Sequence, residues 1–275
     1  MTREPNNESN ARPIGVFDSG IGGLSVVRAL TEALPNENIV YFGDTARVPY
    51  GPKSPQVVRD YAQQDADVLL KYDVKLIVVA CNTVSAVALD VVQKRTKIPV
   101  LGVILPGAEA AVRATKKKRV GVIGTVGTIA SNAYANAIRQ FDPEVRVFGK
   151  ACPLFVPLAE EGWIDHKATE LIAKEYLFPL TLEKIDTLVL GCTHYPILRE
   201  TIDKVLHHTV TLVDSGESSA QAVKDWLTGG GMLNTSTLKP NHQFFVSDIP
   251  AKFSEVGERF LGKKLGRVQR IAGFN

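Results

Sequence analysis

Cysteine is scarce in this sequence, because the 275 residues contain only Cys81, Cys152 and Cys192. The three cysteines lack the Cys-x-x-Cys or Cys/His spacing of a zinc site, so no metal centre is expected. The N-terminal segment lacks the apolar core of a signal peptide, which indicates the cytoplasm, where structural disulfides are rare. Cys81 and Cys192 are therefore expected to remain thiols that are free for chemistry.

The sequence also lacks a long apolar run and a strong charge of either sign. No stretch reaches the length needed to span a bilayer, so no membrane partner is expected. The net charge is +3, and the basic residues are dispersed apart from residues 116–119, which we expect to form a solvated turn. Nucleic-acid binding is not expected, because it needs a larger basic stripe with base-reading partners.

Two segments of the chain share one motif. Residues 77–83 read Ile-Val-Val-Ala-Cys-Asn-Thr, and residues 188–194 read Leu-Val-Leu-Gly-Cys-Thr-His. Each is a short apolar run, typical of a buried strand of a parallel sheet, that ends in a cysteine. Open α/β sheets bind ligands at the carboxyl ends of their strands, so both cysteines are candidate site residues.

A glycine-rich turn precedes each cysteine strand at a similar distance. Gly15 lies 66 residues before Cys81, and Gly121 lies 71 residues before Cys192. The near-equal spacing favours two copies of one α/β unit, although any two βα units share some of these features. The second turn lacks the first glycine pair of the dinucleotide fingerprint, so no nicotinamide cofactor is expected.

Strand and helix patterns alternate along the chain. One helical pattern ends before Pro35, and another begins at Ser54-Pro55, an N-cap followed by proline at the first helical position. The alternation predicts two pseudo-symmetric, doubly wound α/β domains with mainly parallel sheets. Strands are expected over residues 14–17, 38–42, 75–80, 98–101, 119–123, 144–148, 185–190, 210–213 and 242–246.

The repeat also predicts the domain organisation. Residues 1–12 are polar and are expected to form a disordered tail. The first domain is predicted over residues 13–105 plus 214–275 and carries Cys81, while the second covers 106–213 and carries Cys192. The active site is then expected in the interdomain cleft, with the two cysteine strands face to face.

Polar groups surround the expected strand ends of the first copy. The segment 17–23 leads a strand into a glycine-rich turn and a helix, which is a plausible cradle for an anion. Asp18 would repel phosphate, so its carboxylate is better suited to proton chemistry or to holding an ammonium group, and an ordinary capped turn is the alternative. The loop 41–51 adds Asp44 and Tyr50 as candidate site residues.

Two equivalent cysteines suit a reaction that inverts a carbon centre. One group removes a proton from one face while the other delivers a proton to the opposite face, and the roles exchange in the reverse direction. A helix N-terminus or a cation lowers the pKa of a thiol from its usual ~8.5, and His194 lies next to Cys192 in position to orient or protonate it. Preorganised donors must also stabilise the developing negative charge.

Together, the motifs resemble the glutamate racemases of the aspartate/glutamate racemase family. The resemblance covers essentially the whole chain after the N-terminal tail. It implies a cofactor-independent isomerase, a homodimer, that interconverts L- and D-glutamate and supplies D-glutamate for peptidoglycan and cell-wall synthesis. The matching segments are 17–23, 43–51, 80–83, 191–196 and 214–216.

The resemblance also implies roles for individual residues. Cys81, assisted by Asp18, would act on the D-enantiomer, and Cys192, assisted by His194, would act on the L-enantiomer. Asp44 and Glu160 match acidic catalytic positions that tune the site. The residues that would hold the substrate's carboxylates and ammonium are Asp18, Ser19, Tyr50, Gly51, Asn82, Thr83, Thr193 and His194.

Three alternatives stay open at this point. The protein is another two-cysteine racemase, acting on aspartate or a hydantoin, although Thr193-His194 stands where aspartate racemases usually carry Thr-Glu. It is a binding protein that holds an amino acid in the cleft without turning it over, a function that has no need of paired thiols. Or it is a redox protein in which Cys81 and Cys192 form a dithiol, which requires them to lie close enough to bridge.

Overall fold

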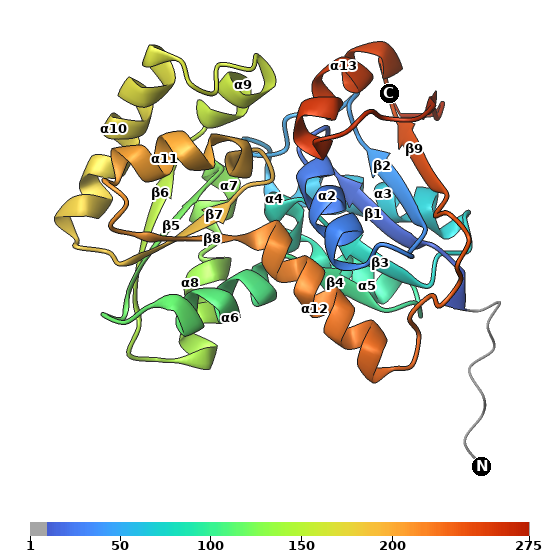
Figure 1. Ribbon diagram of the computed structural model, residues 1–275, viewed down its shortest axis with the longest axis horizontal. Helices are drawn as coiled ribbons and strands as arrows, with labels where there is room; N and C mark the ends of the chain where they lie inside the picture. The colour runs from blue at the N-terminus through green and yellow to red at the C-terminus, as the bar shows by residue number, and fades with distance from the viewer. Residues whose placement is uncertain (1–9, 275) are drawn as a thin grey trace.

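Two parallel sheets organise the protein in a computed structural model that describes residues 10–274. The first sheet has the strand order β10-β9-β2-β1-β3-β4, and the second has β6-β5-β7-β8 (Figure 1). The strands are β1 Ile14–Asp18, β2 Ile39–Gly43, β3 Leu76–Val79, β4 Val100–Gly102, β5 Arg119–Gly124, β6 Arg146–Ala151, β7 Thr187–Gly191, β8 Thr211–Asp214, β9 His242–Val246 and β10 Val268–Arg270.

Helices cover both sheets, as the alternating pattern predicts. The α-helices of the first half are α2 Leu24–Ala33, α3 Pro55–Leu70, α4 Asn82–Val87, α5 Leu89–Arg95 and α13 Pro250–Leu261. The remaining helices are α6 Ile104–Ala114, α7 Val126–Ala130, α8 Ala133–Phe141, α9 Phe155–Glu160, α10 Lys167–Leu182, the 3₁₀ turn η1 Tyr195–Leu198, α11 Arg199–Val205 and α12 Ser215–Gly229. None of the described helices combines the length and apolarity needed to cross a bilayer.

The two sheets repeat one topology. The order β2-β1-β3-β4 in the first sheet has the same succession as β6-β5-β7-β8 in the second, and every pair of neighbouring strands is parallel. Strands β1 and β5 therefore occupy equivalent central positions, as do the two cysteine strands, β3 and β7. The structure confirms two pseudo-symmetric α/β units.

The strand expectations are confirmed, with ends that shift by up to three residues, and β10 is an addition. Strand β10 has only three residues, of which Val268 alone is apolar, so the sequence carries no strand signal there. The two helix boundaries are also confirmed. Helix α3 begins after Ser54, whose hydroxyl accepts a hydrogen bond from the amide of Val57, and α2 ends at Ala33.

The carboxyl-terminal part of the chain returns to the first sheet. Strands β9 and β10 pair beside β2, and helix α12 packs against both α2 and α6 where the two halves meet (Figure 1). We retain the division at residues 105/106 and 213/214 as a proposal.

The expected tail falls mainly on residues 1–9, outside the described residues. Its last part is corrected, because Asn10 is buried and its amide donates to the carbonyl of Gly231 at 3.0 Å.

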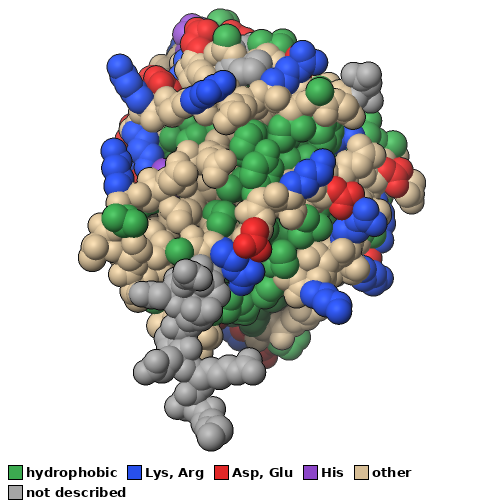
Figure 2. Space-filling model, turned by 90° about the vertical axis from the view of Figure 1, so that its right-hand side faces the viewer, with side chains coloured by type: hydrophobic (Ala, Val, Ile, Leu, Met, Phe, Trp, Pro, Cys, Tyr) green, Lys and Arg blue, Asp and Glu red, His purple; other side chains and the backbone are tan. Residues whose placement is uncertain are grey.

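The face that closes the first half carries charges of both signs. Figure 2 shows Lys and Arg side chains interspersed with Asp and Glu around an apolar strip, with no continuous basic stripe on the described part of this face. A nucleic-acid footprint gathers its cations along one groove or helix. This dispersal matches the small net charge of the chain.

A buried ion pair holds the base of the first half together. The Nζ atom of Lys75 lies 2.6 Å from Oε2 of Glu37, and both side chains are almost inaccessible. Lys75 also donates to the carbonyl oxygens of Asn10 and Met232, while Oε1 of Glu37 accepts the amide of Asn234. The pair thus connects four chain segments, around residues 10, 37, 75 and 232–234.

Replacing Lys75 by methionine is expected to lower the free energy of unfolding by about 3 kcal/mol, because the change leaves the Glu37 carboxylate buried without its cation. Urea denaturation at neutral pH measures this loss. The control is Lys94→Met, since Lys94 forms an exposed ion pair with Asp90 that is worth under about 1 kcal/mol. Equal losses in the two variants would contradict a structural role for the buried pair.

Candidate active site

Both repeated cysteines line a single pocket between the two halves. Cys81 directly precedes α4 in the first half, and Cys192 follows β7 in the second, so equivalent chain positions meet. The three cysteines are free thiols. The lining residues are Ser19, Val48, Pro49, Tyr50, Gly51, Cys81, Asn82, Thr83, Thr125, Val156, Cys192, Thr193 and His194.

The pocket is small in this structure. Its volume of about 30 Å³ is room for one or two water molecules. A larger cavity of about 430 Å³ lies between α2, α11 and α13, but neither thiol lines it. A molecule of more than a few atoms therefore fits between the cysteines only when this pocket is wider.

Cys81 is buried at the start of α4. Its Sγ atom lies 3.6 Å from the hydroxyl oxygen of Ser19, which follows the neighbouring strand β1. Burial raises the pKa of the Cys81 thiol to about 12, and the nearby Asp18 carboxylate contributes to the same shift. The Cys81 thiol is therefore protonated at neutral pH.

Asp18 lies behind the pocket and does not line it. Its Oδ2 accepts the backbone amides of Gly20 and Gly23 at 3.1 and 3.0 Å, and its Oδ1 lies 3.5 Å from the hydroxyl oxygen of Thr193. Burial raises the pKa of Asp18, and the positive charge of His194 opposes that shift. Asp18 therefore shapes the glycine-rich turn and ties it to the second half.

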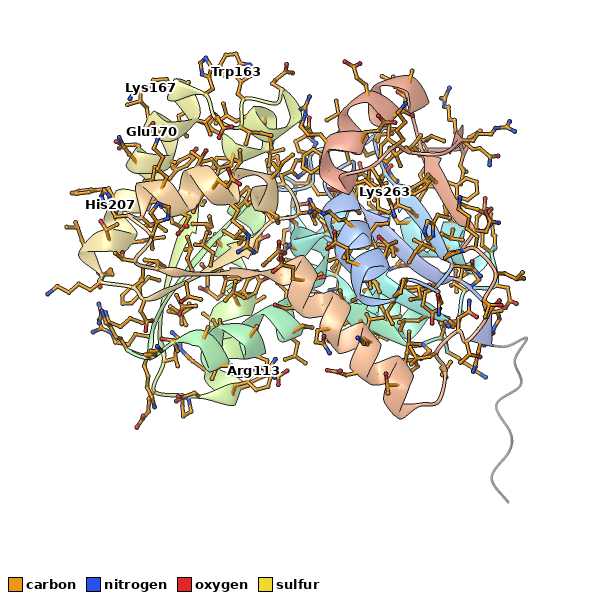
Figure 3. The ribbon with its side chains drawn as sticks, in the orientation of Figure 1. Arg113, Trp163, Lys167, Glu170, His207 and Lys263 are labelled. Atoms are coloured by element: carbon orange, nitrogen blue, oxygen red, sulfur yellow. The ribbon has the colours of Figure 1, made fainter. Side chains whose placement is uncertain are left out.

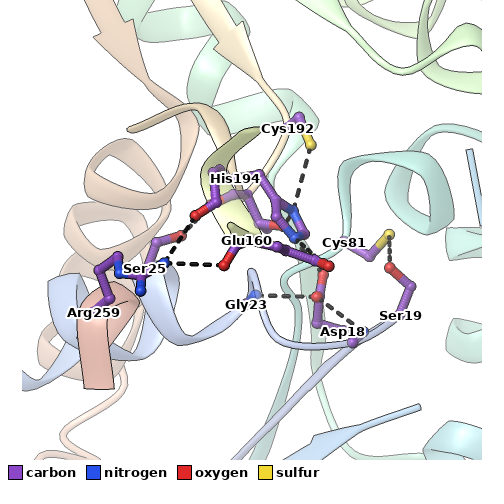
Figure 4. A network of polar contacts seen from close by, with 12 residues as sticks. Asp18, Ser19, Gly23, Ser25, Cys81, Glu160, Cys192, His194 and Arg259 are labelled. Atoms are coloured by element: carbon purple, nitrogen blue, oxygen red, sulfur yellow. Dashed lines mark hydrogen bonds and ion pairs between the residues drawn. The ribbon is translucent and has the colours of Figure 1, made fainter. Parts of the chain in front are cut away.

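His194 connects Cys192 to Glu160 (Figure 4). Its Nδ1 lies 3.9 Å from Sγ of Cys192, and its Nε2 lies 3.0 Å from Oε1 of Glu160. Burial disfavours the charged imidazolium, but the hydrogen bonds to Cys192 and Glu160 outweigh burial and raise the pKa of His194 to about 10. His194 is therefore positively charged at neutral pH. Of the five histidines it is the buried one, whereas His207 lies on the outer side of the second half (Figure 3).

Helix α13 of the first half supports this histidine from behind. The ring of Phe260 packs edge-on against the imidazole of His194, with ring centroids 5.2 Å apart. Arg259 donates to the carbonyl oxygens of Ala159 and Glu160 at the end of α9 (Figure 4). The carboxyl-terminal helix thus fixes both members of the His194–Glu160 pair.

The polar residues after Cys81 are bound by the second half. Asn82 accepts a hydrogen bond from the hydroxyl of Tyr134 at 2.7 Å, and the hydroxyl of Thr83 lies 2.9 Å from that of Thr125. Sequence reasoning missed Thr125 as a pocket residue. A signal was present, because Thr125 follows β5 as Ser19 follows β1 in the first copy.

Asp44 lies beneath the pocket and does not line it. It accepts hydrogen bonds from the Tyr50 hydroxyl and from Nε of Arg47, the latter at 2.6 Å. The Tyr50 hydroxyl is thus engaged below the pocket, while the carbonyl of Gly51 accepts the amide of Gly127 in the second half at 2.9 Å. Asp44 thus contacts the pocket residue Tyr50, and Glu160 contacts the pocket residue His194.

The fold and the site define a class of protein, a two-lobed α/β protein with a thiol at the same position of each lobe. The described residues contain no cluster of three His, Cys, Asp or Glu side chains that could hold a metal. The profile of the Asp/Glu/Hydantoin racemase family matches residues 14–223, and the chain belongs to this family of isomerases.

Relatives support this membership over almost the full chain. A glutamate racemase from Geobacter metallireducens is 54% identical over 261 residues, which cover 95% of this chain and 97% of that one. A glutamate racemase from Chlorobaculum tepidum is 55% identical over 264 residues, which cover 96% and 97%.

Solved structures show the same fold. Glutamate racemase from Francisella tularensis in complex with D-glutamate has a TM-score of 0.90 at 44% identity, with 97% of this chain and 99% of that chain covered. Escherichia coli glutamate racemase, in complex with L-glutamate and the activator UDP-MurNAc-ala, has a TM-score of 0.76 at 29% identity, with 95% and 98% covered.

Proposed function

We propose that this protein is a glutamate racemase that moves a proton at the α-carbon between Cys81 and Cys192 without a cofactor. The observation that carries the proposal is the meeting of both thiols, from equivalent chain positions, in one pocket. Relatives called glutamate racemase support the substrate. By resemblance, we infer that the enzyme is a cytoplasmic homodimer whose D-glutamate enters peptidoglycan.

The reaction needs one base and one acid on opposite faces of the α-carbon. For L-glutamate, the Cys192 thiolate takes the α-proton, and the electron pair of the broken C–H bond remains on the substrate as a carbanion. The Cys81 thiol then gives its proton to the opposite face and becomes a thiolate. The enzyme now has a Cys81 thiolate and a Cys192 thiol, which is the state that D-glutamate requires. Proton exchange restores the Cys192 thiolate and the Cys81 thiol.

The geometry of the two halves fits these roles. The positively charged imidazole of His194 lies 3.9 Å from Sγ of Cys192, next to the sulfur that takes the α-proton of L-glutamate. The pKa of Cys81 near 12 keeps a proton ready on the other side. Ser19, Asn82 and Thr193 are among the donors that line the pocket, and we infer that they hold the carboxylates and stabilise the carbanion.

Turnover is expected to fall as the pH rises through about 10, because His194 then loses its proton. The groups that face this imidazole are Cys192, Glu160 and Asp18. Glu160→Gln removes one of the two groups that raise the pKa of His194, so the alkaline limb should move to lower pH. The pH profile of kcat/KM measures it, and Glu161→Gln, an exposed neighbour, is the control. An unmoved limb in Glu160→Gln would show that His194 does not govern it.

The proposed function is tested by incubating the protein with L-glutamate in heavy water, with no added cofactor or metal. Loss of optical activity, together with one deuterium gained at the α-carbon, would establish deprotonation and reprotonation. Absence of both inversion and exchange would discard glutamate, and the same assay on aspartate would then separate a sister racemase from a binding protein.

A further inference from the structure

A buried polar cluster lies beneath the pocket wall formed by Tyr50 and Gly51. Its members come from the loop after β2, from α3 and from the end of β9, and each is at most 8% exposed. The cluster contains two carboxyl groups and one guanidinium. The members are Asp44, Arg47, Tyr50, Asp65 and Ser247.

The hydrogen atoms of this cluster can be counted. Asp44 receives three donors: Nε of Arg47 at 2.6 Å, the Ser247 hydroxyl at 2.9 Å, and the Tyr50 hydroxyl in a shorter contact. The Tyr50 hydroxyl oxygen also lies 3.0 Å from Oδ2 of Asp65. A tyrosine hydroxyl has one hydrogen, and the shorter contact with Asp44 uses it. A hydrogen bond between Asp65 and Tyr50 therefore needs a hydrogen from Asp65.

The charges lead to the same assignment. Arg47 contacts both carboxyl groups, since its Nη2 lies 3.0 Å from Oδ1 of Asp65, and its guanidinium stacks 4.0 Å from the ring centroid of Tyr61. One cation neutralises one carboxylate, and a second unpaired charge is very costly in a dry site. The three hydrogen bonds that Asp44 accepts stabilise a negative charge there, so Asp65 is the group that stays neutral.

We propose that Asp65 is a positioning residue that stays protonated. Its carboxyl group donates a hydrogen bond to the Tyr50 oxygen and thereby holds the Tyr50–Gly51 wall against the second half. The proposal rests on the proposed function. Burial, followed by the Asp44 charge, raises the pKa of Asp65 well above its usual range, in agreement with the hydrogen count. The held wall includes the Gly51 carbonyl that binds the amide of Gly127.

Infrared spectroscopy tests the proton directly. A protonated carboxyl group has a carbonyl stretch separate from that of a carboxylate, so the wild-type minus Asp65→Asn difference spectrum at pH 8 should contain this band. The difference isolates Asp65 from the other buried carboxyl groups. A carboxylate band in its place would overturn the proposal, and this outcome does not depend on whether glutamate is the substrate.

Matched substitutions test the positioning role. Asp65→Asn keeps a donor toward Tyr50 and an acceptor toward Arg47, so kcat and KM should remain within about twofold of wild type, whereas Asp65→Ala should lower kcat/KM about tenfold by releasing the wall. If Asn impairs the enzyme as much as Ala, a neutral hydrogen-bond donor at position 65 does not hold the wall. If Ala is harmless, other contacts hold the wall. Either result overturns the proposal. An inactive wild-type enzyme would instead refute the proposed function.

Discussion

Cys81→Ala and Cys192→Ala are each expected to abolish racemisation of glutamate while the fold stays intact. Both thiols line the pocket, one on each side of the boundary between the halves, and neither forms a disulfide. Positioned acid–base groups each contribute on the order of 10²–10⁴ in rate, so either loss should lower kcat at least a hundredfold. Circular dichroism at the substrate band measures the loss of inversion.

The control for both variants is Cys152→Ala. Cys152 is equally buried but does not line the pocket, so this variant should racemise glutamate at the wild-type rate. Near-normal inversion in either of the other two variants would refute the two-base mechanism.

A single remaining thiol should still work on one face of the substrate. In heavy water, Cys81→Ala should exchange the α-proton of L-glutamate for deuterium without inversion, because Cys192 takes and returns a proton on the same side. Cys192→Ala should do the same with D-glutamate. Exchange of the opposite enantiomer in each case would reverse the assignment of the two cysteines.

The sequence predicts the parts of this site that follow from chain periodicity. The apolar runs before Cys81 and Cys192 are short and bounded by polar residues, and a parallel strand places the next residue at a ligand-binding edge. The duplicated spacing then requires the two edges to be equivalent, which is why the strand order repeats in the two sheets.

Other parts of the site depend on contacts between segments that are far apart in the chain. Phe260 touches His194 from 66 positions away, and Ser247 reaches Asp44 across 203 positions. No local pattern marks such pairs, because α13 and β9 reach the site only by the return of the chain to the first sheet. The proton on Asp65 likewise follows from the one hydrogen of Tyr50 and from burial, which a sequence does not show.

Gly22 shows how closely the two halves approach each other. A Cβ atom at this position would lie 2.4 Å from Nδ1 of His194 and 2.5 Å from the hydroxyl oxygen of Thr193. Real Cβ atoms do not come so close to other heavy atoms, so a side chain would have to displace the histidine or separate the halves. Position 22 therefore needs glycine because there is no space for a side chain. Its backbone conformation does not require glycine, since its φ is not in the left-handed region.

Gly22→Ala is accordingly expected to lower kcat about a hundredfold, because a shift of about 1 Å in a catalytic group has this effect. The shift would move Nδ1 of His194 relative to Cys192 and leave the Cys81 side in place. Steady-state kinetics in both directions measure the loss, and the melting temperature reports on the fold. Since the two enantiomers are equally stable, kcat/KM should fall equally in both directions.

The matched control is Gly20→Ala, two residues earlier in the same turn. A Cβ atom there would lie 3.3 Å from Cγ2 of Val48, an exposed side chain with room to move. This variant should therefore keep most of its activity. If Gly22→Ala retains kcat within about twofold of wild type with an unchanged melting temperature, the position of His194 is not critical to catalysis. If the two variants lose activity equally, the turn as a whole is sensitive, and the contact between Gly22 and His194 is not the cause.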